Sequence, residues 1–185
     1  GCTLPLKYRI LESAMPPPIQ ALALHKFQQL ALMQDPGQYS KLHHWLRTLL
    51  RLPFGVYHRP SHKSHRSKVA HLCHTQDVMD QWIYGHAEAK ESILHMVSQS
   101  LTNPDGMPQI IGIQGPVGNG KTTLVRQGVA RALGRPFVHI SLGGASDVAL
   151  LHGHAYTYEN SSYGRVVSSL IDGGCMNPVL YFDEL

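Results

Sequence analysis

The sequence predicts an α/β fold in which a parallel sheet is flanked by helices and preceded by a separate helical segment. From residue 109 onward, short apolar runs alternate with longer helical patterns, which is typical of parallel strands covered by helices. The last run, Val179–Phe182, is apolar on both faces, as buried parallel strands are. Because the chain begins Gly1-Cys2 without an initiator methionine and ends at Leu185 directly after this run, we interpret it as a piece of a longer protein, truncated after that strand.

Residues 1–56 are predicted to form the helical segment. Ile19–Met33 has apolar residues every three or four positions and follows three prolines, so a helix is expected to begin there. After a turn at Asp35-Pro36-Gly37, Ser40 can cap a second helix, Lys41–Arg51. The two helices are expected to form a hairpin.

Residues 57–75 are polar, basic and poor in core residues, so we predict a linker. Thr75 or Asp77 can then cap a short helix that runs to Trp82. A longer helix is expected over His86–Leu101.

Residues 76–185 are predicted to hold an incomplete α/β domain. The expected strands are Gln109–Gln114, Pro136–Leu142 and Val179–Phe182, and the expected helices between them are Lys121–Leu133 and Arg165–Ile171.

Composition and charge restrict the class of protein. Apolar residues make up 43% of the chain, and no stretch approaches the roughly 18 apolar residues that span a bilayer, so no membrane segment is expected. Three widely spaced cysteines form no disulfide framework, which favours the cytoplasm and leaves an organellar matrix open.

From Pro36 to Gln76 there is no acidic residue, so this basic zone is a candidate surface for nucleic acid. Its histidines do not have zinc-ligand spacing, and we interpret them as solvated.

A phosphate-binding pattern stands between a predicted strand and a predicted helix. Gly115–Thr122 reads GPVGNGKT and matches G-x-x-x-x-G-K-[ST] at every fixed position. Glycines allow backbone amides to turn toward phosphates at the positive end of a helix dipole. Lys121 is expected to reach the β- and γ-phosphates, and Thr122 to bind Mg²⁺. The predicted nucleotide contacts here are Gly115, Pro116, Val117, Gly118, Asn119, Gly120, Lys121, Thr122 and Thr123.

An acid pair, Asp183-Glu184, follows the last predicted strand. Strand alternation sends neighbouring side chains in different directions, so the two carboxylates can have different tasks. We expect Asp183 to hold Mg²⁺ and Glu184 to orient or deprotonate the water that attacks the γ-phosphate. The sequence therefore predicts a magnesium-dependent nucleotide hydrolase with Glu184 and Lys121 as catalytic residues, although the phosphate loop itself does not select adenine over guanine.

Further motifs are much more specific than the phosphate loop. They are Ser141–Asp147 (SLGGASD), Gly153-His154, Thr157-Tyr158, Gly164-Arg165 and Asn177-Pro178 leading to the acid pair, with Met15-Pro16-Pro17, Trp45-Leu46, Leu52–Gly55 and Tyr84-Gly85-His86 upstream. Together they resemble Lon proteases, a branch of the AAA+ superfamily of P-loop NTPases. The resemblance implies ATP as the nucleotide and Tyr84 and Gly85 as adenine contacts.

The same resemblance implies a homo-hexamer that hydrolyses ATP to thread polypeptide substrates through a pore into a Ser-Lys peptidase domain that is not in these residues. Tyr158 would be the pore aromatic, although Tyr158-Glu159-Asn160 departs from the usual aromatic–aliphatic–glycine pattern. Two alternatives stay open. One is a non-proteolytic AAA+ remodeller, and the other is a nucleic-acid-associated motor that uses the basic zone.

Overall fold

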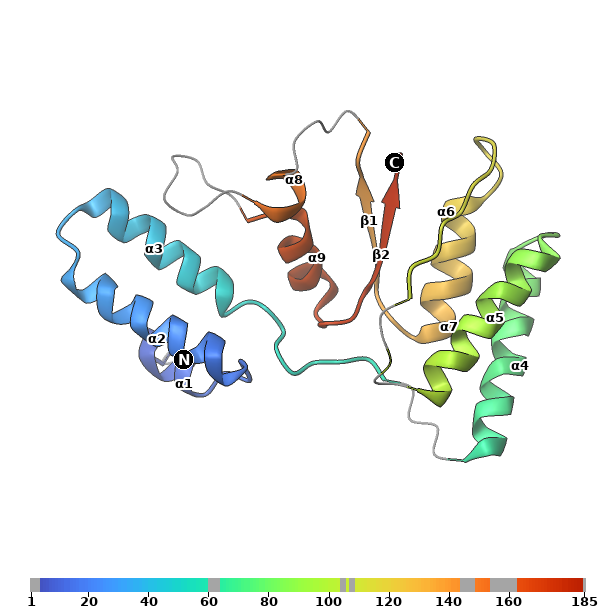
Figure 1. The fold of residues 1–185 in the computed structure, drawn as a ribbon, viewed down its shortest axis with the longest axis horizontal. Coiled ribbons are helices and arrows are strands. Elements are labelled where there is room, and N and C mark those ends of the chain that lie inside the picture. Colours follow the sequence, from blue (N-terminus) through green and yellow to red (C-terminus); the bar gives the residue numbers. More distant parts are fainter. Residues whose placement is uncertain are drawn as a thin grey trace. The chain divides into compact units, whose positions relative to one another are not determined.

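The computed structural model describes residues 4–59, 64–103, 106, 109–143, 149–153 and 163–184 (Figure 1). The chain divides into two compact units, which are described in turn. The first unit contains Gly1–Tyr57, Ile140–Asn177 and Glu184–Leu185, and the second contains His58–His139 and Pro178–Asp183.

Helices dominate the described residues. In chain order the elements are α1 (Leu6–Leu11), α2 (Pro17–Leu32), α3 (Pro36–Leu49), α4 (His65–Trp82), α5 (Ala87–Thr102), α6 (Lys121–Thr123), η1 (Leu124–Ala130), α7 (Arg131–Leu133), β1 (Phe137–Ser141), α8 (Ala149–His152), α9 (Arg165–Gly173) and β2 (Val179–Asp183).

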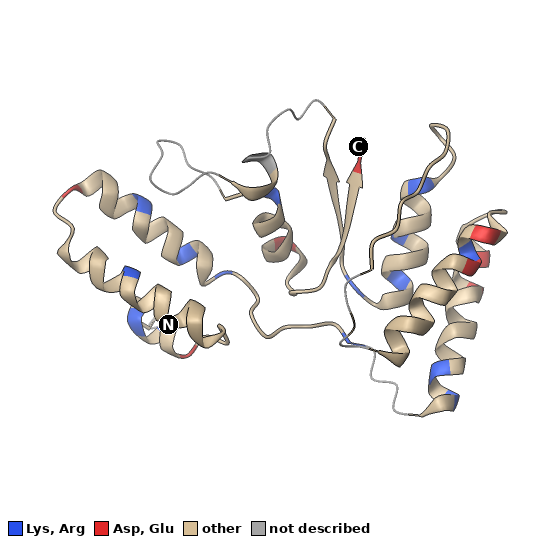
Figure 2. Cartoon of the chain, viewed as in Figure 1, with Lys and Arg blue, Asp and Glu red and all other residues tan. Residues whose placement is uncertain are grey.

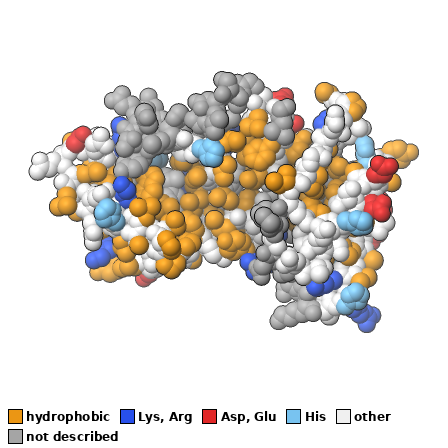
Figure 3. All heavy atoms as spheres, in the orientation of Figure 1, with side chains coloured by type: hydrophobic (Ala, Val, Ile, Leu, Met, Phe, Trp, Pro, Cys, Tyr) orange, Lys and Arg blue, Asp and Glu red, His pale blue; other side chains and the backbone are white. Residues whose placement is uncertain are grey.

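The first unit contains the predicted helical hairpin. Helices α2 and α3 pack against each other, as expected, and the short helix α1, which the sequence patterns did not reveal, packs on α2. Their shared core is formed by Ile10, Met15, Ala23, Leu30, Leu42 and Leu46. Apolar side chains also reach the surface over this region (Figure 3). Among them, Tyr8 and Leu11 are about half exposed.

The cap predicted for the second helix of the hairpin was wrong. Helix α3 begins at Pro36, and Asp35 Oδ1 accepts a hydrogen bond from the Gly37 amide at 2.8 Å. Proline suits the first helical position because its φ is already helical and its missing N–H has no partner to lose there. Ser40 therefore lies inside the helix.

The beginning predicted for the next helix was also wrong. Helix α4 begins at His65, and Ser64 Oγ accepts from the Ser67 amide at 3.1 Å while Ser67 Oγ accepts from the Ser64 amide. This reciprocal cap satisfies two amides that a helix would otherwise leave unpaired. Residues 65–75 are thus part of α4, and Thr75 is buried in mid-helix. The three-part division at 57 and 75 stays a prediction.

The second unit is built around the helix that follows the phosphate loop. This helix runs without a break through α6, the π-helix η1 and α7, as predicted, and ends at Gly134. It packs against α4 and α5, and the predicted helix over 86–101 is confirmed by α5. The core is formed by Met79, Ile83, Ile93, Met96, Val97, Leu101, Leu124, Val125, Val129, Ala132 and Leu133.

Two of the three predicted strands are confirmed. Strands β1 and β2 form a two-stranded parallel sheet (Figure 1), and the Val179 amide donates to the Pro136 carbonyl at 2.8 Å. Gln109–Gln114, in contrast, is not a strand. A strand requires a neighbour for its backbone groups, and within the described ranges neither β1 nor β2 pairs with this segment. Although the segment is apolar, its Ile110 side chain is almost fully exposed.

The remaining elements belong to the first unit. Helix α9 confirms the helix predicted over 165–171 and continues to Gly173, and the short helix α8 packs against it. Among the helices that the structure describes, none combines the length and the apolar character needed to cross a membrane. Mixed helices with a small parallel sheet are compatible with the predicted α/β class.

Candidate nucleotide site

The phosphate loop is a tight turn that leads directly into the helix. Gly118 and Gly120 have φ values of +80° and +76°, a region that costs residues with a Cβ atom roughly 1–2 kcal/mol. The Leu124 amide donates to the Gly120 carbonyl at 2.8 Å and closes the first helical turn. Glycine therefore stands at both loop positions that have a left-handed backbone, at the amino end of a long helix whose dipole favours anions.

Lys121 folds back over this loop. Its Nζ donates to the carbonyl oxygens of Gly115 and Pro116, both at 2.9 Å. Phosphate oxygens carry more charge than carbonyl oxygens and form stronger hydrogen bonds with an ammonium group. The ammonium is therefore already held at the loop, with acceptors that a phosphate can replace.

Thr122 and Asp183 are linked through a residue that sequence reasoning did not select. Thr122 Oγ1 donates to the Tyr181 hydroxyl at 3.4 Å, and that hydroxyl donates to Asp183 Oδ1, also at 3.4 Å. His139 Nε2 lies 3.2 Å from the other carboxylate oxygen, Asp183 Oδ2. Because an ionised carboxylate only accepts hydrogen bonds, His139 donates through Nε2.

The donors around this link fit magnesium. Mg²⁺ prefers hard oxygen ligands and binds through one or two carboxylates or hydroxyls together with phosphate oxygens. Thr122 and Asp183 supply one hydroxyl and one carboxylate on either side of a single phenol oxygen. The two predicted ligands thus belong to one hydrogen-bonded group.

Glu184 is held by a residue at the end of strand β1. Ser141 Oγ donates to Glu184 Oε2 at 3.0 Å, and Glu184 has a φ of +59°, which is unusual for a residue with a side chain. A Cβ atom at position 143 would overlap the Glu184 carboxylate, so Gly143 leaves the space that this side chain occupies. Backbone strain of this kind persists only where the surroundings hold it and is frequent at functional sites.

The other predicted site residues stay predictions. Thr123 lies in α6, directly after Thr122. Tyr84 and Gly85 lie between α4 and α5, and the Tyr84 side chain is fully exposed. Val117, at the loop tip, is also fully exposed. Tyr158 lies outside the described residues.

Three contributors were missed by sequence reasoning: Ser141, His139 and Tyr181. Tyr181 carries a usable signal, because residues two apart on a strand share a face and it stands two positions before Asp183. The partnership of His139 with Asp183 depends on how β1 pairs with β2, and no sequence pattern contains that information.

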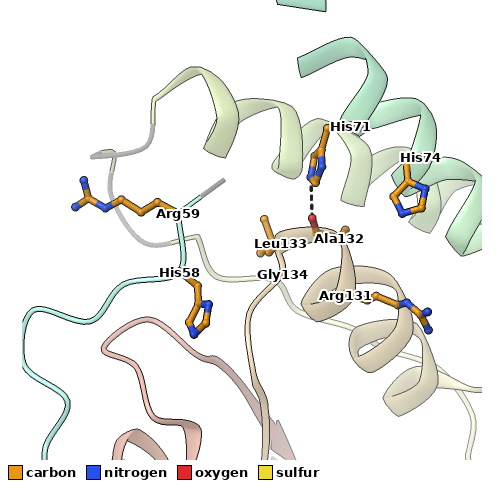
Figure 4. Close-up of a pocket in the computed structure, with 8 residues that line it drawn as sticks. All are labelled: His58, Arg59, His71, His74, Arg131, Ala132, Leu133 and Gly134. Carbon is orange, nitrogen blue, oxygen red and sulfur yellow. Dashed lines mark hydrogen bonds between the residues drawn. The ribbon is translucent and has the colours of Figure 1, made fainter. Parts of the chain in front are cut away.

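A second feature of the same unit is a cavity of about 340 Å³ lined by imidazole and guanidinium groups. Figure 4 shows that these side chains do not converge: His71 donates through Nε2 to the Ala132 carbonyl at 2.8 Å, and Arg131 extends away, with its Cζ 5.7 Å from the centre of the Trp82 ring. In the part of the chain that the structure describes, no three metal-ligating side chains come together.

The basic zone, residues 36–76, belongs to more than one element. Its Lys and Arg residues lie on α3, on α4 and on the segment between them (Figure 2). Lys41 and Arg47 are in α3, which is part of the first unit, whereas Arg66 and Lys68 are in α4, which is part of the second. The basic residues of this zone are close in sequence but belong to two different units.

Comparison with known proteins shows which proteins the chain resembles. No protein-family model matches the sequence. Over 179 residues, 96% of the chain, it is 35% identical to Lon protease 2 of Herpetosiphon aurantiacus, and over 180 residues it is 33% identical to the Lon protease of Clostridium beijerinckii. The chain is Lon protease-like. A mitochondrial Lon protease homolog of Zea mays is 32% identical to the Lon-like chain over 171 residues.

The similarity covers nearly all of the Lon-like chain but only part of each relative. The chain spans 21% of the Herpetosiphon protein, 21% of the Clostridium protein and 17% of the Zea mays protein. It thus corresponds to about a fifth of the length of these relatives.

Proposed function

We propose that the Lon-like chain binds Mg-ATP at its phosphate loop and contributes this site to the motor of an ATP-dependent protease. The observation that carries the proposal is the position of Lys121, whose ammonium is held on a loop with two left-handed glycines at the beginning of a long helix. A loop of this geometry with a lysine at its mouth is suited to a polyphosphate.

Each residue of the site has a separate task in this proposal. The loop amides and Lys121 bind the β- and γ-phosphates, while Thr122 and Asp183 hold the metal. Magnesium, when bound, neutralises charge on the phosphate oxygens. Glu184 orients the attacking water and accepts its proton, and Ser141 keeps the Glu184 carboxylate in place.

For the whole protein we propose the activity that the name of its relatives indicates. ATP hydrolysis in a homo-hexamer would drive polypeptide substrates past Tyr158 toward a Ser-Lys peptidase domain, with Tyr84 and Gly85 against the adenine, in the cytoplasm or an organellar matrix. Support comes from the similarity to Lon proteases over 96% of the chain. A non-proteolytic remodeller, or a motor that acts on nucleic acid, would use the same nucleotide site.

The site is tested by Lys121→Ala in the full-length protein. Loss of a charge-assisted contact with two phosphates should weaken ATP binding by at least about a hundredfold, since hydrogen bonds to charged groups contribute about 1.5–3 kcal/mol each. Lys7→Ala, on the exposed side of α1, is the matched control and should bind ATP like the wild type. Calorimetric titration with ATP measures both, and unchanged binding by Lys121→Ala would refute the proposed site.

The protease assignment is tested separately by ATP-dependent cleavage of an unfolded protein substrate. ATP turnover without peptide-bond cleavage would favour the remodeller. ATP turnover stimulated by DNA at moderate salt would favour the nucleic-acid motor.

A further inference from the structure

We propose that Tyr181 is a positioning residue of the magnesium site, whose hydroxyl orients both the Thr122 hydroxyl and the Asp183 carboxylate toward the metal. This inference rests on the proposed function. It adds a residue from the middle of β2 to a site otherwise formed by a loop and an acid pair.

The Tyr181 ring is held in place by strand β1. Its centroid lies 5.9 Å from that of Phe137 and 5.5 Å from that of His139, with interplanar angles of 29° and 27°. Phe137 and His139 are two positions apart on β1 and therefore share one face of the sheet. With a ring stacked on both, Tyr181 has its hydroxyl position fixed by packing, which a positioning residue requires.

The direction of each hydrogen bond follows from the chemistry of the three groups. Asp183 only accepts as a carboxylate, so the single proton of the Tyr181 hydroxyl points to Asp183 Oδ1. The Tyr181 oxygen is then an acceptor for Thr122, whose own proton is directed to it. The Thr122 oxygen keeps two lone pairs that face away from Tyr181. A hydroxyl that binds a cation needs this arrangement, with its proton turned away from the metal.

The Asp183 carboxylate is held at both oxygens. Tyr181 contacts Oδ1, and His139 contacts Oδ2 at 3.2 Å. Partners that hold a metal ligand in this way commonly change metal affinity by 10- to 100-fold when they are removed. The two Tyr181 contacts are 3.4 Å long, beyond the 2.5–3.0 Å of close O–H···O hydrogen bonds, so we expect a smaller effect of about three- to tenfold.

A tyrosine that only fills the core would have the same ring contacts, so the test must separate the hydroxyl from the ring. Tyr181→Phe removes the oxygen and keeps the stack on Phe137 and His139. Tyr181→Leu removes both. Tyr39→Phe, on an exposed ring of α3 that stacks on His43, is the matched control for loss of a phenol hydroxyl.

The experiment measures ATP binding by the full-length protein with a fluorescent ATP analogue, first in EDTA and then across a magnesium titration. Tyr181→Phe should raise the magnesium concentration for half-maximal enhancement of binding by about three- to tenfold, with unchanged affinity in EDTA and an unchanged melting temperature. Tyr181→Leu should show the same shift together with a lower melting temperature, and Tyr39→Phe should show neither.

An unchanged or lowered magnesium midpoint in Tyr181→Phe would overturn the inference and leave the proposed function intact. Wild-type ATP binding that does not depend on magnesium would also overturn it. Absence of ATP binding by the wild type would remove the proposed function and this inference together.

Discussion

Replacement of Gly128 by alanine should stabilise the protein, because this glycine lies inside the helix that carries the phosphate loop. A Cβ atom at position 128 would lie 3.5 Å from Ile83 Cδ1 and Ile93 Cδ1 and 3.6 Å from Met79 Cγ, which are ordinary van der Waals distances. Alanine in a helix interior is favoured over glycine by roughly 0.5–1 kcal/mol. A buried methyl group adds about 0.8 kcal/mol, so the free energy of unfolding should rise by about 1–2 kcal/mol.

Gly134 is the matched control at the end of the same helix. Its φ is +60°, and no described atom would lie within 4 Å of an added Cβ, so space is available but the backbone conformation is unfavourable. Gly134→Ala should therefore lower the free energy of unfolding by about 1–2 kcal/mol. The same chemical change thus has opposite expected signs at two positions of one helix.

Thermal unfolding followed by circular dichroism measures both variants. For a chain of this size, 1 kcal/mol corresponds to roughly 2–4 °C in the melting temperature. A lower melting temperature for Gly128→Ala would show that Ile83, Ile93 and Met79 leave no room for a methyl group. Equal signs for the two variants would refute the distinction between available space and backbone conformation.

Two further predictions concern the core of the second unit and the hydrolytic step. Met79 is fully buried, so Met79→Ala should cost about 2–5 kcal/mol in urea unfolding, whereas Leu32→Ala, at an exposed position, should change stability by no more than about 0.5 kcal/mol. Glu184→Gln in the full-length protein should bind ATP with wild-type affinity but lose most of its ATP turnover, and turnover equal to that of the wild type would contradict the role given to Glu184.

Local sequence patterns were sufficient to predict the elements that depend mainly on residues close in sequence. The periodicity of Ile19–Met33 and the proline before it predicted α2. The alternation of short apolar runs with helical patterns, together with the glycines at their ends, predicted β1, β2 and the helix that follows the phosphate loop. The beginning of α4 was misplaced because a reciprocal Ser64–Ser67 cap outweighed the polar composition of the residues after it.

Local sequence patterns could not predict which segments pair as strands. Gln109–Gln114 has the composition of a strand, but its backbone groups need a neighbour, and among the described residues β1 and β2 pair only with each other. Propensity selects segments that suit a sheet, whereas the hydrogen-bonding partner decides whether a strand forms.

The sequence by itself determined the phosphate loop, because glycine is what permits the left-handed backbone at positions 118 and 120 and the motif places Lys121 and Thr122 next to it. It also determined that two acids stand at the carboxyl end of β2. Only the tertiary structure decided the partners of these acids on the neighbouring strand, which are His139 at Asp183 and Ser141 at Glu184. Backbone conformation is encoded by neighbours in sequence, whereas these contacts exist only after β1 and β2 have paired in one register.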